Sequence, residues 1–128
     1  MTIPYGKHKI DSKDLKFVQK SLKSELITQG PLVKKFEINL KNKVKSKYCV
    51  AVNSATSALH ISCLALNINK KSLVWTVPNT FVSTSNSALF CGAKIDFVDI
   101  DNKSFNISLV ELKKKLERSK KIKRLPSL

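Results

Sequence analysis

Residues 53–57 bring together side chains that could do chemistry in this 128-residue sequence. An amide and three hydroxyls, in the order Asn53-Ser54-Ala55-Thr56-Ser57, stand between an apolar run and an apolar helical pattern. Backbone N–H groups at the start of a helix bind anions, and small side chains let a phosphate approach closely. The alternative is ordinary capping of the helix by Ser54 or Thr56. The segment matches neither the dinucleotide-binding nor the triphosphate-binding glycine pattern.

Two other places could hold a ligand. Phe81 follows the next apolar run, where its ring could stack on a flat cofactor or, alternatively, pack in the core or at the start of a helix. The carboxylates of Asp96, Asp99 and Asp101 could bind a metal ion. Alternate side chains of a strand point to opposite faces, which favours a solvated strand end and turn instead. We therefore predict no metal site.

The remaining reactive side chains form no complete catalytic set. His8 and His60 have no serine or cysteine partner in their sequence context. Cys49, Cys63 and Cys91 make no CxxC pair, and each lies in an apolar stretch, which is typical of a buried free thiol. We therefore predict no catalytic residue in this chain and a reduced, cytoplasmic compartment.

The order of predicted elements indicates an α/β fold. Apolar runs predict strands at residues 48–52, 73–77 and 94–100, and residues 58–66 and 80–90 predict the helices between them. Residues 58–66 are apolar nearly all round, which predicts a helix buried on most sides. Ser108 is predicted to cap a last helix. This alternation implies right-handed crossovers and a mainly parallel sheet, which would bring residues 53–57 and 78–81 to one edge.

Two amphipathic helices precede these strands. Asp11 and Asp14 are predicted to open the first helix, which ends before Thr28. Gly30 is predicted to be a stop, and Pro31 suits the first turn of the second helix. We expect three parts: an N-terminal helical arm of residues 1–46, a partial large domain of residues 47–117, and a basic tail of residues 118–128.

The charge is the abnormal feature of the composition: 24 Lys+Arg against 9 Asp+Glu, a net +15. Such a charge favours an anionic partner, so a small basic protein that binds nucleic acid or a membrane surface is the alternative function. Only Arg118 and Arg124 are arginines, the residue preferred for base and phosphate recognition. We expect neither a signal peptide nor a membrane-spanning helix. We expect neither a specific nucleic-acid partner nor a membrane.

Five segments, in this order and spacing, resemble the beginning of the DegT/DnrJ/StrS family of pyridoxal-phosphate-dependent sugar aminotransferases. They are residues 3–6, 26–31, 52–60, 75–86 and 91–101. Each segment is weak alone, but the set is specific, and it covers most of residues 2–117. The resemblance implies the N-terminal part of the large domain of a type I aminotransferase-like fold, which is three-layered around a mainly parallel sheet and incomplete here.

The resemblance also implies roles for individual residues. Thr56 and Ser57 match positions that hold the phosphate of pyridoxal 5'-phosphate, and Phe81 matches the aromatic residue that stacks on its pyridine ring. The positions that match contacts to a nucleotide-sugar substrate are Tyr5, Glu25, Leu26, Ile27, Thr28, Ser54 and Ala55. The implied reaction moves an amino group, from a donor such as glutamate, to a UDP-linked 4-keto sugar. The implied assembly is a homodimer.

The sequence departs from the family in two ways. Family members are much longer, and the part without a counterpart here carries the lysine that binds the cofactor, the aspartate that pairs with the pyridine nitrogen, a serine of the phosphate cup and a small C-terminal domain. From Ser119 onward the residues no longer resemble the family. We therefore expect a truncated or frameshifted product that is inactive as a transaminase by itself.

Overall fold

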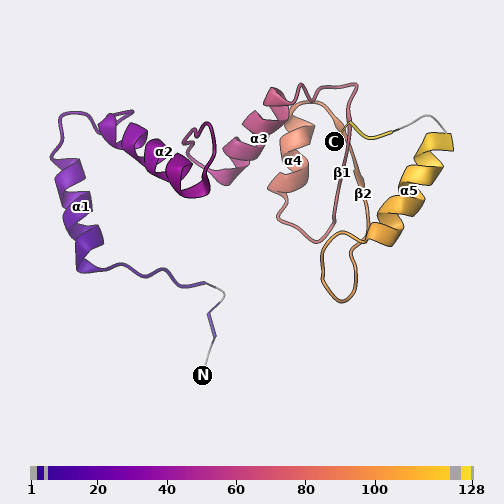
Figure 1. Ribbon diagram of the computed structural model, residues 1–128, viewed down its shortest axis with the longest axis horizontal. Coiled ribbons are helices and arrows are strands. Elements are labelled where there is room, and N and C mark those ends of the chain that lie inside the picture. The colour runs from indigo at the N-terminus through magenta and orange to yellow at the C-terminus, as the bar shows by residue number, and fades with distance from the viewer. Residues whose placement is uncertain (1–2, 5, 122–124, 128) are drawn as a thin grey trace. The chain divides into compact units, whose positions relative to one another are not determined.

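The computed structural model describes residues 3–4, 6–121 and 125–127. Contacts divide the chain into two compact units, Met1–Ala51 and Val52–Leu128. Along the chain (Figure 1) the elements are α1 (Ser12–Leu22), α2 (Pro31–Val44), α3 (Ala55–Ala65), β1 (Leu73–Thr76), α4 (Ser83–Phe90), β2 (Lys94–Phe97) and α5 (Leu109–Lys121). The predicted α/β class is confirmed.

The start of α1 follows the predicted pattern. The Asp11 carboxylate accepts hydrogen bonds from the N–H groups of Lys13 and Asp14, at 2.7 and 3.0 Å. The Asp14 carboxylate accepts in return from the Asp11 N–H at 3.0 Å, which completes a capping box. These bonds satisfy N–H groups that have no partner inside the helix. No residue of α1 is buried, so local bonds hold its first turn.

Gly30 and Pro31 mark the start of α2 as predicted. Pro31 occupies the first turn, where its missing N–H costs nothing. A Cβ at Gly30 would stand 2.2 Å from the carbonyl oxygen of Leu26, so only glycine fits this turn. The helix ends at Lys45, whose φ of 55° is left-handed. No residue of α2 is buried.

The strand predicted at residues 48–52 is wrong. These residues are neither helix nor strand, and Tyr48 and Val50 are 75% and 73% exposed. The Ala51 N–H donates to the Glu37 carboxylate at 2.9 Å rather than to a neighbouring strand. The composition favours a strand, but a strand exists only with a partner, and the described residues provide none beside this segment.

The two strands that form are parallel, as predicted. Leu73 pairs with Lys94 and Thr76 with Phe97. Both strands are shorter than the predicted runs, which reached residues 77 and 100. Beyond β2, Val98 still donates to Thr76, and Ile100 forms an antiparallel bridge with Ile107. The chain turns because the Asp101 carboxylate binds the N–H groups of Lys103 and Ser104.

The core of the second unit lies between α3, α4 and one face of the sheet. It consists of Cys63, Ile68, Val74, Ala88 and Ala93, with Cys91 and Ile95 packed against it. The prediction that the helix after residue 58 is buried on most sides is wrong. Only Cys63 of α3 is buried, because α4 alone packs closely on it among the described elements. The predicted helix at residues 80–90 begins at Ser83.

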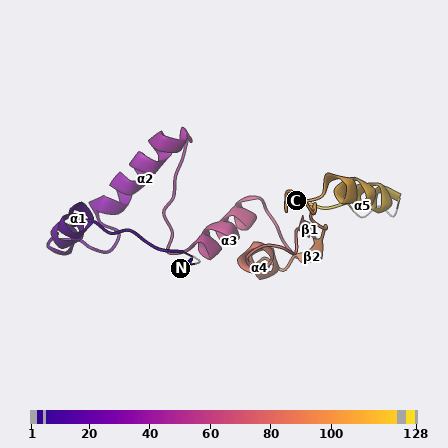
Figure 2. The same cartoon turned by 90° about the horizontal axis from the view of Figure 1, so that it is seen from below.

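Helix α5 lies on the opposite face of the sheet from α4 (Figures 1 and 2). Ser108 caps it as predicted, since its hydroxyl accepts from the Glu111 N–H at 3.3 Å. The Lys115 ammonium binds the Asp96 carboxylate at 2.7 Å, donates to the Phe97 carbonyl and stands 5.0 Å from the centre of the Trp75 ring. One lysine therefore ties α5 to both strands, and the unit has three layers.

Candidate functional site

The N-terminus of α3 is built by the residues of the first candidate segment. Ser54 is the N-cap, and its hydroxyl oxygen accepts from the Ser57 N–H at 3.1 Å. The Ser57 hydroxyl lies 3.0 Å from the Ser54 hydroxyl and donates to the Asn53 side-chain oxygen at 2.7 Å. Asn53, Ser54 and Ala55 are exposed, and Thr56 is half-buried. The capping interpretation is thus confirmed for Ser54.

Capping leaves the anion-binding interpretation open. Within the described residues, the N–H groups of Ala55 and Thr56 have no protein acceptor, because Ser54 engages only those of Ser57 and Ala58. These free groups carry the positive end of the dipole of an 11-residue helix. The Thr56 hydroxyl stands beside them. The turn can therefore accept an anion without giving up its cap.

Phe81 lies in the loop between β1 and α4. Its side chain is 74% exposed, so the alternative that it packs in the core is wrong. Its carbonyl accepts from the Thr84 N–H at 3.0 Å, which fixes the backbone before α4. No side chain caps α4 at its N-cap residue, Val82. The backbone of Phe81 is therefore fixed, and its exposed ring can stack on a planar ligand.

The loops that carry these residues lie at the same end of the α3–α4 pair. In Figure 1, α3 and α4 both run from a lower N-terminus to an upper C-terminus. The two helices pack on each other through the core and through an edge-to-face contact of His60 and Phe90, whose ring centres are 5.5 Å apart. Residues 53–57 and the loop with Phe81 thus share one end of one unit, although the strand predicted before residue 53 is absent.

The predicted substrate-contact residues fall into both units. Glu25, Leu26, Ile27 and Thr28 form the exposed connection between α1 and α2 in the first unit. The Ser24 hydroxyl donates to the Leu26 carbonyl at 3.3 Å, and Gly30 closes the turn behind it. Ser54 and Ala55 belong to the second unit. Tyr5 lies outside the described residues.

The three candidate metal-binding carboxylates serve local structure. Asp96 pairs with Lys115, and Asp99 accepts from the N–H of Ile100 at 2.8 Å. Bonds from the Ser104 N–H, the Ser104 hydroxyl and the Lys103 N–H hold the pKa of Asp101 below its usual value. Within the described part of the chain, no three metal-binding side chains gather in one group.

The three cysteines differ in their surroundings. All are free thiols. The predicted burial is confirmed for Cys63 and is wrong for Cys49 and Cys91, which are half-buried. Desolvation, and then the neighbouring Cys63, raise the pKa of the Cys91 thiol. The Cys91 thiol contacts the Ser87 carbonyl at 3.5 Å. Because a raised pKa lowers the share of reactive thiolate, this environment does not suit a nucleophile.

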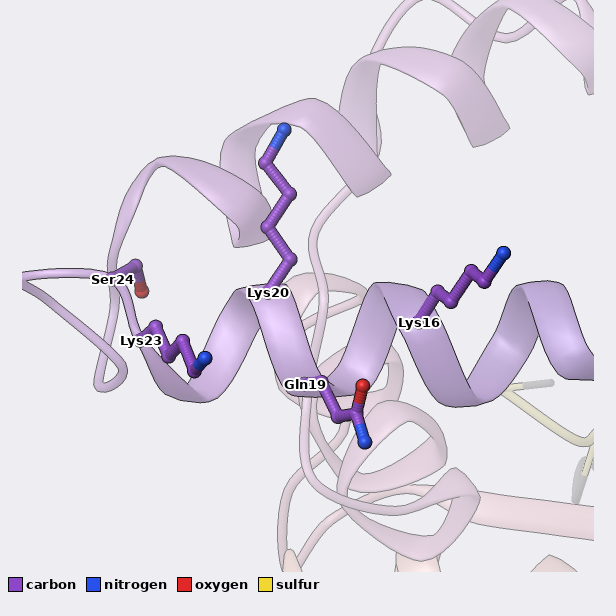
Figure 3. A pocket seen from close by; sticks show the side chains of 5 residues that line it. All are labelled: Lys16, Gln19, Lys20, Lys23 and Ser24. Carbon is purple, nitrogen blue, oxygen red and sulfur yellow. The ribbon is translucent and has the colours of Figure 1, made fainter.

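Three lysines line a hollow of about 510 Å³ along α1 and the residues that follow it. Figure 3 shows its lining residues, Lys16, Gln19, Lys20, Lys23 and Ser24. In that view the side chains of Lys16 and Lys20 point to one side of α1 and that of Gln19 points to the other. The side chains are exposed or half-buried, which is typical of a solvated basic surface. Across the described residues, no helix is both long and apolar enough to cross a bilayer.

Comparison with known proteins assigns the family. The sequence profile of the DegT/DnrJ/EryC1/StrS aminotransferase family matches residues 8–122. The chain belongs to this family. The resemblance of the five segments is confirmed, and the match extends past Ser119, where we expected the family pattern to end.

Relatives of this family member include an enzyme and solved structures. A UDP-4-amino-4,6-dideoxy-N-acetyl-beta-L-altrosamine transaminase of Campylobacter jejuni is 44% identical over 100 residues, which are 78% of this chain and 26% of that protein. The PLP-form of the putative sugar aminotransferase Spr1654 from Streptococcus pneumoniae has a TM-score of 0.83 at 26% identity, over 89% of this chain and 29% of that one. It has also been solved in a PMP-form.

A further structure contains PLP together with glutamate. It is a GDP-4-keto-6-deoxymannose-3-dehydratase with a trapped PLP-glutamate geminal diamine, with a TM-score of 0.80 at 28% identity, over 88% of this chain and 31% of that one. The chain thus spans between a quarter and a third of the length of these relatives. The fold matches the N-terminal part of type I aminotransferase structures.

Sequence reasoning missed two residues that organise the second unit. Asn53 orients the Ser57 hydroxyl, a role that its position before the N-cap could have indicated. Lys115 ties α5 to the sheet, but the sequence offers no signal that separates it from the neighbouring lysines at 113 and 114.

Proposed function

We propose that the protein supplies the phosphate-binding and ring-stacking parts of the cofactor site of a sugar aminotransferase. The observation that carries the proposal is the capped α3 N-terminus, which keeps the N–H groups of Ala55 and Thr56 free. A phosphate dianion fits these donors and the helix dipole. The exposed ring of Phe81, at the same end of α3 and α4, supports stacking of a pyridine ring.

Each residue has a separate task in this site. The N–H groups of Ala55 and Thr56 and the Thr56 hydroxyl would donate to phosphate oxygens. The Ser57 hydroxyl donates to Asn53 in the structure, at 2.7 Å. Turning that proton toward a phosphate would exchange a neutral hydrogen bond for a stronger, charge-assisted one. Phe81 would hold the ring in the plane that the reaction needs.

We extend the proposal to the substrates by family membership. Pyridoxal 5'-phosphate, when bound, carries the amino group from donor to acceptor. Tyr5, the exposed loop of residues 25–28, Ser54 and Ala55 would contact the nucleotide sugar. The name of the Campylobacter relative supports a UDP-linked sugar as substrate, and the structure that contains PLP and glutamate supports glutamate as donor. We propose that the acceptor is a 4-keto sugar of the kind used for pseudaminic acid and other surface polysaccharides. For the full-length family enzyme we propose a cytoplasmic homodimer, and the three free thiols of this chain support the compartment.

The test is binding of pyridoxamine 5'-phosphate to the purified 128-residue chain, measured by calorimetry. This form of the cofactor is chosen because its amine cannot condense with any of the 22 lysines. We expect Thr56→Ala with Ser57→Ala to weaken binding by about tenfold or more, because charge-assisted hydrogen bonds are lost. Ser62→Ala is the matched control, since that hydroxyl is also on α3 but donates to the Ala58 carbonyl at 2.8 Å.

Phe81→Leu distinguishes the ring-stacking part of the proposed site from its phosphate-binding part. It should weaken pyridoxamine 5'-phosphate binding and leave the weaker binding of inorganic phosphate unchanged. Equal affinity for the cofactor in the wild-type chain, the double variant and Ser62→Ala would refute the phosphate assignment. With glutamate and cofactor present, we expect no amino transfer by the 128-residue chain alone, because the covalent chemistry needs a positioned lysine.

A further inference from the structure

The two strands of the sheet have outer edges that differ. Alternate residues of a parallel strand face opposite neighbours. Lys94 donates to the Ser72 carbonyl at 3.0 Å and Val98 to the Thr76 carbonyl at 2.9 Å, so the even-numbered residues of both strands face each other. Odd-numbered residues therefore turn their N–H and C=O groups outward.

Charged side chains cover the outer edge of β2. The Phe97 N–H donates to the Asp96 carboxylate at 2.8 Å, and the Phe97 carbonyl accepts from the Lys115 ammonium. Charged side chains that occupy the outer backbone groups of an edge strand discourage pairing with another strand. Among the described residues of β2, Ile95 is the other one whose backbone faces outward, and it precedes the covered Phe97.

The outer edge of β1 is covered at one residue only. The Ser127 N–H donates to the Leu73 carbonyl at 2.7 Å, and the Leu73 N–H donates to the Ser127 hydroxyl at 3.3 Å. The next outward residues, Trp75 and Val77, have no acceptor or donor there among the described residues. This edge can therefore pair with an extended chain, and Ser127 already pairs with it at Leu73.

Residues 48–52 have the complementary property. Their sequence, Tyr-Cys-Val-Ala-Val, has high β-propensity and contains neither charge, proline nor glycine. Glu37 engages the Ala51 N–H, but the backbones of Cys49 and Val50 have no partner within the described part of the chain. The side chains of Tyr48 and Val50 are exposed. The segment thus has the composition of a strand but no partner strand among the described residues.

Charge restricts where two copies can meet. Each copy carries +15, so most of their surfaces repel each other. Residues 48–52 and residues 73–77 are both free of charge, and they offer unpaired backbone groups of both kinds. The two segments therefore match in length, polarity and hydrogen-bonding need.

We propose that the chain associates with a second copy of itself by strand addition, with residues 48–52 of one copy pairing along the β1 edge at Trp75 and Val77 of the other. This use of an exposed edge as a template is a known mode of recognition between chains. The Ser127 contact competes with the incoming strand at Leu73. Association strengthens as salt screens the repulsion between copies.

The first test needs no variant. Amide hydrogen exchange of the full chain is followed over a dilution series, at low and at high salt. We expect residues 49–52 and residues 75–77 to gain protection together as concentration rises, and more strongly at high salt. Self-association that leaves either segment unprotected would overturn the proposal, and so would a chain that stays monomeric at every concentration.

The second test uses paired charges and a deletion, with sedimentation equilibrium as the readout. Val50→Lys should weaken association by about tenfold or more, because it puts a charge into the pairing segment. Val110→Lys adds the same charge at an exposed valine of α5, which is 63% exposed against 73% for Val50, and it should not weaken association. Removing residues 125–128 should tighten association. If both lysine variants behave alike, the contact lies elsewhere. Circular dichroism checks that each variant keeps its helices.

Discussion

The two units of this chain hold their helices by different means. In Met1–Ala51, neither α1 nor α2 has a buried residue, and their ends are fixed by the Asp11 capping box and the Gly30 turn. In Val52–Leu128, α4 buries Ser83, Ser87 and Ala88 against a core and a sheet. The difference shows that a helix can be specified by the capping residues at its ends or by the residues that it buries on one face. Only the second kind adds much to cooperative stability.

The largest expected effect comes from the core of the second unit. Val98 is 1% exposed, directly after β2. Val98→Ala removes two buried methyl groups, so we expect the free energy of unfolding to fall by about 2 kcal/mol. Val44→Ala, the same truncation at an exposed position of α2, should change it by less than about 0.5 kcal/mol. Urea unfolding followed by circular dichroism measures both, and equal losses would erase the contrast between the units.

A smaller effect is expected at the cap of α1. Asp11→Ala removes both bonds to the first turn, and we expect a cost of about 1 kcal/mol to that helix. Asp11→Asn keeps a cap of similar strength and serves as the control. Amide exchange at Lys13 and Asp14 should accelerate in the alanine variant only. Acceleration in α4 as well would show that the stability of the second unit depends on the cap of α1.

The smallest effect concerns pH and the turn after β2. The pKa of Asp101 is lowered in the folded chain, first by the Ser104 N–H, then by the Ser104 hydroxyl and the Lys103 N–H. A lowered folded pKa means that the contribution is full above the unfolded pKa of an aspartate and is lost as pH falls through the folded pKa. Asp101→Asn keeps the acceptor oxygen and removes the titration. The free energy of unfolding should therefore fall less in the variant than in the wild-type chain between neutral and acidic pH. Parallel dependences of this free energy on pH in the two proteins would contradict the assignment.

Local signals made much of this fold predictable. Asp11, Ser54 and Ser108 all cap the helices that their sequence positions indicate, because a cap depends on residues three positions away. Residues 48–52 show the limit, since their β-propensity is local but a partner strand is not. The same holds for the site. The places of Phe81 after a strand and of residues 53–57 before a helix made both candidate ligand-binding residues in the sequence. The anchoring of α5 by Lys115 could not be predicted, because it depends on contacts between residues far apart in the sequence.

The chain contains one tryptophan, and the surroundings of Trp75 make it an optical reporter. Its indole nitrogen is buried without an acceptor among the described residues, and the Lys115 ammonium stands 5.0 Å from its ring centre. Emission should therefore shift to longer wavelength when α5 leaves the sheet and water reaches the indole. Because Trp75 belongs to the second unit, the signal is silent on the first. Fluorescence therefore reports the unfolding of the second unit alone, whereas helical circular dichroism reports the helices of both units.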